Sequence, residues 1–365
     1  MNKDKYDKKI IFALILIPFI GIVGTAIYSS QYGIVWQEPF LLFIFWISTG
    51  LGITVGYHRL FSHRSFVAHP ILEWILSIFG AAALEMSAIR WCANHRKHHR
   101  YLDTDKDPYS ITKGFFHAHM GWILMNNPVK VEQVDDLLKK PALKFQDKYY
   151  FLIFIVAGVL LPIGLGFIWG RPLGALLWGV FLRISLVHHF TYFINSLCHY
   201  VGKKPYDYKS SSRDSWYMAL LTFGEGFHNF HHRFQWDYRN GIHWFHFDPS
   251  KWLIWIFSKI GLAKNLKKAD YFIIMKAKTL TKWNQANIAL ETIPEQFRKN
   301  YNNKLIDLKN KIAELEKSLK QTKLFINKNN SLDNWNENMN LLKAQYQNLL
   351  KSLSVILITI QNTKY

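Results

Sequence analysis

The chain has 365 residues, of which 50% are hydrophobic, 16% aromatic and only 19% charged. Its mean hydropathy of -0.03 hides a split between several almost wholly apolar stretches and a polar, lysine-rich last third. This split argues against an ordinary soluble protein and predicts a membrane domain with a soluble appendage. The net charge of +20 fits a protein beside an anionic leaflet. Since much of that charge lies in the tail and beside the apolar stretches, we expect no nucleic-acid partner.

Four stretches are long and apolar enough to cross a bilayer, which takes about 20 mainly apolar residues. We expect these spans at residues 10–28, 40–57, 149–169 and 173–197. A fifth apolar stretch, residues 71–89, contains Glu73 and Glu85, and we interpret it as an interfacial or partly re-entrant helix. A spanning helix there would place the histidine clusters before and after it on opposite sides of the membrane.

The distribution of Lys and Arg predicts the orientation. The leader before the first span and the long segment between spans two and three are basic, whereas the other two links contain a single Arg between them. We therefore expect both termini and the clustered histidines on the cytoplasmic side. The first apolar run is of spanning length, so we expect no cleaved signal peptide. The short leader and the lack of a fused haem domain favour a bacterial cytoplasmic membrane.

Nine histidines stand in four clusters, HRLFSH, HRKHH, NSLCH and HNFHH. They are His58, His63, His95, His98, His99, His199, His228, His231 and His232. The HxxHH spacing places three rings on one face of a helix, and neutral imidazole is a preferred ligand of iron, zinc and copper. One ion cannot use nine ligands. The clusters therefore predict two metal ions with open positions, rather than chance histidines on surface helices.

Two spacings near these clusters give further expectations. His58 and His63 would lie about 140° apart on a regular helix, so we expect the helix to end or bend between them. Asn195 and His199 are four residues apart and share a face of the fourth span. We interpret Asn195 as lying on the metal side, and an interhelical hydrogen bond is the alternative.

The ligand types favour iron. Zinc sites usually stop at four ligands and often include Cys, whereas this set contains only histidine and points to a redox-active metal. Asp103, Asp105 and Asp107 follow the second cluster. We expect these acids to orient imidazole N–H groups, with helix capping and turns as the alternative.

The sequence changes character after residue 296. A heptad-like apolar stripe, a break at residues 327–334 and a second stripe predict a helical hairpin. The first stripe is Leu305, Leu308, Ile312, Leu315 and Leu319, and the second is Met339, Leu342, Tyr346, Leu349 and Leu353. We therefore divide the chain into a membrane domain, residues 1–295, and a C-terminal hairpin, residues 296–365. The hairpin either packs on itself or mediates self-association or partner binding.

The clusters and their surroundings resemble the membrane fatty acyl desaturases of the stearoyl-CoA Δ9 type. The resemblance covers about residues 35–255 and rests on GYHRLFSH, WCANHRKHHRYLDTDKDP, NSLCH and GEGFHNFHHRFQWDYRNG, in this order. It implies an all-α integral membrane fold with four transmembrane helices, a cytoplasmic helical cap that holds a di-iron site, and a bent acyl tunnel. It also implies an O2-dependent oxidoreductase that introduces a cis double bond, at Δ9, into a saturated long-chain acyl thioester or lipid.

The resemblance also assigns residues. One iron would take His58, His63, His95, His99 and His231, and the other His98, His199, His228 and His232, with a water held by Asn195. Thr191 and Tyr192 match the bend of the tunnel, and Trp91 is a further candidate for substrate contact; aromatic packing is the alternative for Tyr192. No catalytic side chain is expected beyond the ligands, because O2 activation is the task of the metal and the protein contributes geometry and a dry cavity.

One departure concerns the carrier group of the substrate. Animal acyl-CoA enzymes of this type have Arg and Asp just before the second cluster, where this chain has Ala93 and Asn94. Acyl-CoA and acyl-lipid substrates therefore both stay open. The sequence contains neither a His-Pro-Gly-Gly haem stretch nor a Cys cluster for iron–sulfur. We expect a separate electron carrier, ferredoxin or cytochrome b5, with its reductase.

Two other functions fit parts of the pattern. A membrane di-iron fatty acid or alkane hydroxylase shares the general histidine pattern, but NSLCH and GEGFHNFHH argue against it. A non-catalytic, histidine-rich metal transporter or sensor would carry polar groups deep inside its spans. The first and third spans have almost none.

Overall fold

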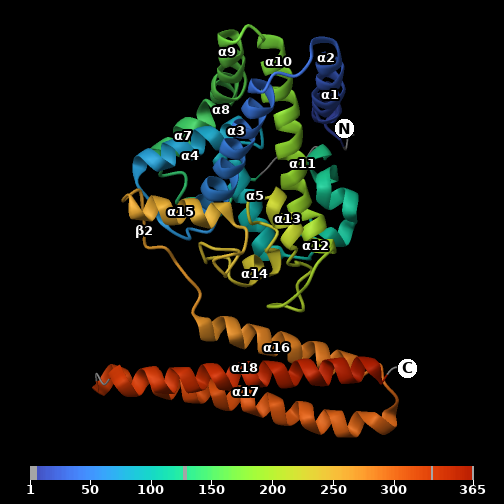
Figure 1. The fold of residues 1–365 in the computed structure, drawn as a ribbon, viewed down its shortest axis with the longest axis vertical. Helices are drawn as coiled ribbons and strands as arrows, with labels where there is room; N and C mark the ends of the chain where they lie inside the picture. The colour runs from blue at the N-terminus through green and yellow to red at the C-terminus, as the bar shows by residue number, and fades with distance from the viewer. Residues whose placement is uncertain (1–5, 126–129, 330–331, 364–365) are drawn as a thin grey trace. The chain divides into compact units, whose positions relative to one another are not determined.

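The computed structural model describes residues 6–125, 130–329 and 332–363. Over these ranges the protein is mainly helical, with one antiparallel pair of short strands, β1 (Val67–Ala68) and β2 (Ala263–Lys264) (Figure 1). The chain forms two compact units. The first contains Met1–Gly202 and Ser211–Lys268, and the second contains Lys203–Ser210 and Ala269–Tyr365. All nine clustered histidines belong to the first unit.

Four helices of the first unit are long and apolar enough to cross a membrane. They run over Lys8–Tyr32, Gln37–Ser62, Tyr150–Ile168 and Pro172–Tyr200. At about 1.5 Å per residue, even the 19-residue third helix nearly matches a hydrocarbon core of about 30 Å. The four predicted spans are confirmed. The second and fourth extend further toward the histidines than predicted.

Each span contains a π-helical segment joined to α-helix. The first consists of α1 (Lys8–Phe19), η1 (Ile20–Gly24) and α2 (Thr25–Tyr32), and the second of α3 (Gln37–Leu51) and η2 (Gly52–Ser62). The third consists of α8 (Tyr150–Ile153), η5 (Phe154–Leu160) and α9 (Leu161–Ile168). The fourth consists of α10 (Pro172–Leu176), η6 (Leu177–Leu182), α11 (Arg183–Asn195) and α12 (Leu197–Tyr200). Such π-helical turns, with hydrogen bonds between residues five apart, are frequent at functional sites.

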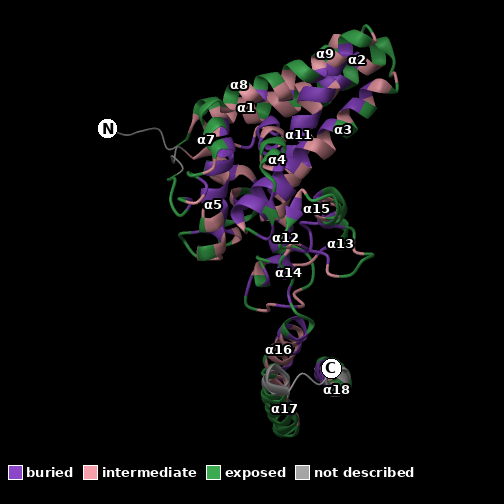
Figure 2. Cartoon of the chain, turned by 90° about the vertical axis from the view of Figure 1, so that its left-hand side faces the viewer, coloured by how far each residue is buried: buried purple, intermediate pink, exposed green. Residues whose placement is uncertain are grey.

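Burial divides the spans into two pairs (Figure 2). In the first and third spans only 11% and 22% of the most apolar window is buried inside the protein, against 56% in each of the other two. The first and third spans therefore leave most of their apolar surface for lipid. The second and fourth form an inner pair, and they carry His58 and His199.

The fifth apolar stretch forms α4 (Pro70–Ala82), a helix of 13 residues and therefore about 20 Å long. It is too short to cross about 30 Å of hydrocarbon. His69 begins the helix, since its Nδ1 accepts the Ile71 N–H at 3.3 Å. A Cβ at Gly52 would lie 2.5 Å from the backbone nitrogen of Gly80. Glycine thus allows the second span to pack closely against α4.

The remaining helices of the first unit form a cap that presents most of the histidines. They are α5 (Ala88–Tyr101), η3 (Ile111–Lys113), η4 (His117–Gly121), α6 (Trp122–Leu124), α7 (Pro141–Lys148), α13 (Trp216–Leu221), α14 (His228–Arg233) and α15 (Pro249–Lys259). The helix α14 carries HNFHH, and its first turn is held by Asp214. One carboxylate oxygen of Asp214 accepts the N–H groups of Asn229 and Phe230, at 2.7 and 3.0 Å.

The second unit consists of α16 (Tyr271–Leu290), α17 (Glu295–Asn329) and α18 (Leu332–Asn362), which lie side by side (Figure 1). The predicted hairpin is formed by α17 and α18. Residues 330–331, within the predicted break, lie outside the described residues. Leu305 and Leu353 of the two stripes are buried in one cluster with Ala286 of α16. Because α16 packs on both hairpin helices, the longer segment of the second unit, Ala269–Tyr365, starts before the predicted boundary at residue 296.

Candidate metal centre

The nine clustered histidines meet in two groups inside the first unit. One group is His58, His63, His95, His99 and His231, and the other is His98, His199, His228 and His232. Within each group the nitrogen atoms available as ligands all lie within 4.8 Å of one another. These are the same two sets that the resemblance implies. The remaining described histidines belong to neither group.

The π-helix η2 places His58 and His63 on the same side of the second span. We expected the helix to end or bend between them, and it ends at Ser62, with His63 as the C-cap, after winding as a π-helix from Gly52. The His63 N–H donates to the His58 carbonyl at 3.1 Å. Because residues five apart are about one turn apart in this geometry, the two rings come to 4.8 Å between centroids. Wider winding before the end of the helix accounts for the HxxxxH spacing.

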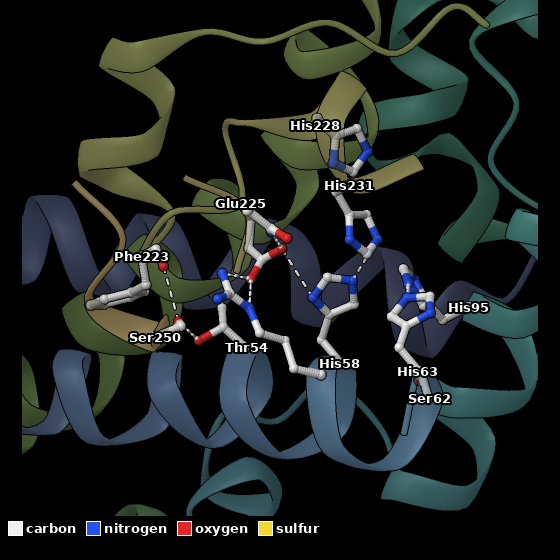
Figure 3. Close-up of polar contacts among 12 residues, drawn as sticks. Thr54, His58, Ser62, His63, His95, Phe223, Glu225, His228, His231 and Ser250 are labelled. Carbon is white, nitrogen blue, oxygen red and sulfur yellow. Dashed lines mark hydrogen bonds and ion pairs between the residues drawn. The ribbon is translucent and has the colours of Figure 1, made fainter. Parts of the chain in front are cut away.

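The outer nitrogens of three rings face oxygen acceptors. Nδ1 of His58 lies 2.9 Å from Oε2 of Glu225, as Figure 3 shows. Nδ1 of His98 lies 2.9 Å from Oδ1 of Asp107, and Nδ1 of His199 lies 2.7 Å from Oγ of Ser211. An N–H donated outward leaves the Nε2 lone pair of each ring directed at the other histidines.

The inner nitrogens converge as metal ligands do. In the first group, Nε2 of His231 lies 3.0 Å from Nε2 of both His58 and His99. In the second group, Nε2 of His228 lies 3.0 Å from Nε2 of both His199 and His232. Each Nε2 has one proton or one lone pair, so hydrogen bonds among the rings cannot satisfy all of them. A cation shared by the rings of each group can, and the residues therefore fit a metal.

Burial keeps these rings neutral. It holds the pKa of His95, His99, His231 and His232 well below 6.5, and the neighbouring imidazoles lower it further. Burial likewise lowers the pKa of His228 to about 3. Neutral imidazole is the form that binds metal.

Glu225 is a functional residue that the sequence reasoning missed. Its side chain joins His58 to Arg59, whose Nη2 lies 2.9 Å from Glu225 Oε1. Burial raises the pKa of Glu225, but His58 and Arg59 outweigh this effect and bring it down to about 2. The only sequence signal was an acid between two glycines, three residues before His228.

Arg59 ties this carboxylate to the cap. Its side chain is 1% exposed and also lies 2.9 Å from Oδ1 of Asp248. Asp248 in turn accepts the N–H groups of Asn240 and Gly241 at 2.8 and 3.0 Å. The ring of His58 is therefore oriented through a buried network that begins in the second span and ends in the loop before α15.

The three acids after the second cluster have different positions. Asp107 contacts His98 directly. Asp103 accepts the Ser211 hydroxyl, and Ser211 is in turn the acceptor for His199. Asp105 is exposed and takes no part in either contact. Two of the three acids thus orient an imidazole, one directly and one through a serine.

An apolar cavity of about 600 Å³ opens beside the first histidine group. Its lining includes His58, His95, Trp91, Thr191, Tyr192 and Asn195. The Trp91 ring stacks on His95 with centroids 4.9 Å apart. Leu14 and Phe154, from the first and third spans, add to the apolar wall. The three predicted substrate residues and Asn195 therefore share one cavity, and their roles remain predictions.

Glu85 is the second residue that the sequence reasoning left without a function. It lines the same cavity and is 8% exposed. One of its carboxyl oxygens accepts the Trp91 Nε1–H at 3.3 Å. Burial raises the pKa of Glu85 to about 8, although contacts with Thr191 and Trp91 lower it. At neutral pH the cavity therefore contains a neutral carboxyl group.

This pKa predicts a pH dependence of apolar-ligand binding in the cavity. An apolar chain removes further water from Glu85 and so favours the neutral form. We expect affinity for a long apolar chain to fall as the pH rises through about 8. For each unit by which the bound chain raises the pKa of Glu85, the affinity at high pH should fall by about tenfold. Equilibrium binding to the detergent-solubilised chain measures it. The variant Glu85→Gln should lose this dependence, and a fall of equal size in that variant would assign it to another group.

Comparisons with known proteins agree with this geometry. The model of the family described as fatty acid desaturase matches residues 10–257. The probable acyl-CoA desaturase of Schizosaccharomyces pombe is 39% identical over 300 residues, which are 78% of this chain and 61% of that protein. Acyl-CoA desaturase 1 of Saccharomyces cerevisiae is 42% identical over 243 residues, 65% of this chain and 48% of that protein. The chain thus spans about half to three fifths of the length of these two relatives.

A bacterial relative is matched over more of its length. The sn-1 stearoyl-lipid 9-desaturase of Anabaena variabilis is 39% identical over 234 residues, which are 63% of this chain and 83% of that protein. The names of these relatives thus include both acyl-CoA and acyl-lipid substrates.

Proposed function

The chain belongs to the fatty acid desaturase family, and from this premise we propose that it is an O2-dependent fatty acyl desaturase. It introduces a cis double bond, at Δ9, into a saturated long-chain acyl thioester or lipid. One observation carries the proposal: the first histidine group faces an apolar cavity of about 600 Å³. Such a cavity suits a flexible apolar substrate.

The metal we propose is iron, two ions per chain. One ion is held by His58, His63, His95, His99 and His231, and the other by His98, His199, His228 and His232, with Asn195 acting through a water. The chemistry that bound iron supplies is activation of O2, which hydrogen abstraction from an unactivated methylene requires. Asp107 and Glu225 orient the rings of His98 and His58, since each carboxylate lies 2.9 Å from the outer nitrogen of its ring.

The chain's own part in the reaction is selection of the reacting methylenes. A saturated chain offers many nearly identical positions, so only the shape of the cavity distinguishes them. Trp91, Thr191 and Tyr192 lie in the cavity wall beside the histidines. We propose that these side chains contact the acyl chain where it bends. The apolar wall also excludes water from the reacting carbons.

The carrier group of the substrate fits a second cavity of about 1220 Å³. Its lining contains Arg90, Lys97, Lys113 and Lys148 together with the carboxylates of Asp105, Asp107, Glu132 and Asp147, and it shares Asn94 with the acyl cavity. Cationic side chains beside an apolar cavity suit a phosphate-bearing carrier. Acyl-CoA and phospholipid both have such a group, and activity assays with each decide between them.

The setting of the enzyme follows from the same sequence features. Four apolar helices and the family place it in a membrane. We propose a bacterial cytoplasmic membrane, with both termini and the histidines on the cytoplasmic side. Electrons come from ferredoxin or cytochrome b5 with its reductase, and membrane lipid surrounds the spans. Self-association through the C-terminal helices is a further proposal.

Expression in a host that lacks unsaturated fatty acids tests the function. We expect growth without supplement and a product whose double bond, located by mass spectrometry, lies at Δ9. Metal analysis of the anaerobically prepared chain should approach two irons. A hydroxylated product would favour the membrane hydroxylase, and metal uptake without any change to lipids would favour a transporter or sensor. Full activity with a stable value near one metal would overturn the di-iron assignment.

The C-terminal hairpin is proposed to lie outside the catalytic unit. Its apolar stripes are buried in its own three-helix unit, and the histidine groups and the acyl cavity contain none of its residues. Deleting residues 300–365 should therefore retain desaturation in cells, with a lower protein level because α16 loses its packing. Product analysis and immunoblotting measure the two effects. Complete loss of activity in a truncated chain that still inserts and binds metal would instead assign the hairpin to dimerisation or carrier recruitment.

A further inference from the structure

The turn between α4 and α5 is strained. Leu84 and Met86 both have positive φ angles, 63° and 84°. This conformation is strained for residues other than glycine, and it persists only where the surrounding structure imposes it. Leu84, Glu85 and Met86 all line the acyl cavity. The strained turn, residues 82–86, is therefore part of the cavity wall.

Side chains of the fourth span hold this turn. The last carbonyl groups of a helix have no partner within the helix. Here the Ala82 carbonyl accepts from Nη1 of Arg183. Nε2 of His188 lies 3.1 Å from the carbonyl oxygens of both Ala83 and Leu84. Two residues of α11 therefore cap the C-terminus of α4, and the turn can move only if these contacts break.

Arg183 is a buried cation inside a span. It is 0% exposed, and no carboxylate lies within ion-pair distance of it among the described residues. Its other donors go to the carbonyls of Gly158 in η5, at 2.7 Å, and Gly179 in η6, at 3.2 Å. Charged groups at such depth are costly and mark functional sites. Here the negative end of the α4 dipole and three carbonyl groups stabilise the charge.

The same helix carries the metal-side residues. Arg183 and His188 lie twelve and seven residues before Asn195 on the fourth span, which corresponds to about 18 Å and about 10 Å along a helix. The wall of the acyl cavity and the residues beside the metal are thus tied to one rigid element. A fixed distance between wall and metal is what selection of one methylene pair requires.

We propose that Arg183 and His188 are positioning residues that fix the turn 82–86 as the wall against which the acyl chain bends. They thereby set which methylene pair faces the metal centre. The inference rests on the proposed desaturase function. Arg183 acts through the turn alone, whereas His188 also lines the cavity, and neither residue has a role at the reacting carbons.

The first test compares His188→Ala with His188→Gln in the full chain, expressed in membranes. His188→Ala should spread the double bond over two or more positions at unchanged metal content. His188→Gln, whose amide can still donate to the two carbonyls, should restore one position. The matched control is His189→Ala, because His189 contacts His119 at 3.1 Å and does not line the cavity. One unchanged position in His188→Ala, or an equal spread in His189→Ala, would overturn the inference.

The second test does not depend on turnover. Affinity for saturated acyl-CoA thioesters of increasing length is measured on the full chain in detergent, without an electron donor. The unaltered chain should gain about fourfold per methylene up to one length and then lose affinity. Arg183→Lys and His188→Ala should shift or flatten this optimum, while His189→Ala keeps it. An identical optimum in all four proteins would overturn the inference. Length-dependent binding without any desaturated product would count against the proposed function alone.

Discussion

The variant His98→Ala should abolish desaturation while the chain still inserts into the membrane. The four apolar helices, rather than the metal, supply the membrane fold. His98 has its inner nitrogen 3.3 Å from that of His232 and its outer nitrogen on Asp107. Removing a partner that only orients a metal ligand already lowers metal affinity or activity about 10-fold to 100-fold. Loss of a ligand should therefore exceed about a hundredfold.

Three measurements check this result in the same membranes: product formation, protein level and bound iron. Iron should fall toward one per chain, because the five-histidine group remains. The control is His243→Ala, since His243 is exposed and belongs to neither histidine group. Normal turnover in His98→Ala would show that the ligand set proposed above is wrong. Loss of activity in His243→Ala at a normal protein level would show that the assay cannot separate ligands from other histidines.

Glu225→Ala should cause the second large effect, on both stability and metal binding. Arg59 would keep only Asp248 as an acidic partner while staying 1% exposed. Removing one partner of a buried ion pair costs about 3–5 kcal/mol. The ring of His58 would also lose the acceptor that directs Nε2 inward. We expect a lower unfolding temperature in detergent and loss of iron from the five-histidine group.

The matched control removes a carboxylate from an exposed pair. Asp307 lies 2.7 Å from Lys311, and both side chains are more than half exposed. Asp307→Asn should change stability by less than about 1 kcal/mol. Equal unfolding temperatures for Glu225→Ala and the unaltered chain would show that the buried network does not stabilise the protein.

Because the pKa of Glu225 is lowered from 4.5 to about 2, its stabilising contribution is fully present above pH 4.5. It is lost only as the pH falls toward about 2.

The spans and the histidines could be predicted because their signals are local. Runs of apolar residues identify four membrane helices, and HxxHH identifies three rings on one helical face without reference to the rest of the fold. The end of the helix between His58 and His63 could be predicted from their spacing, but the π-helical winding that brings the two rings together could not. The calculation assumed 3.6 residues per turn, and η2 is wound more widely.

The buried residues that orient the site, Glu225 and Arg183, could not be predicted because their partners are distant in the sequence. Glu225 is separated from Arg59 by 166 residues, and the Arg183 contact to Ala82 joins residues 101 apart. A charged residue near an apolar run appears in the sequence only as an interruption. The packing of α16 on the hairpin was missed for a similar reason. Its burial pattern has no heptad-like stripe, so nothing in the sequence links it to the leucines of α17 and α18.

The π-helical segments give the four spans a property that substitution experiments do not reveal. Each such segment contains one residue more than an α-helical turn would use. Deleting a single residue from η6 would let the fourth span wind as a regular helix and would leave everything after it on its present face. Deleting one residue from α11, which is already wound as an α-helix, would instead rotate everything after it by about 100°, and Asn195 and His199 would no longer face the other histidines. Membrane helices of this kind should therefore tolerate loss of a residue within a π-helical segment far better than loss of a residue elsewhere in the span.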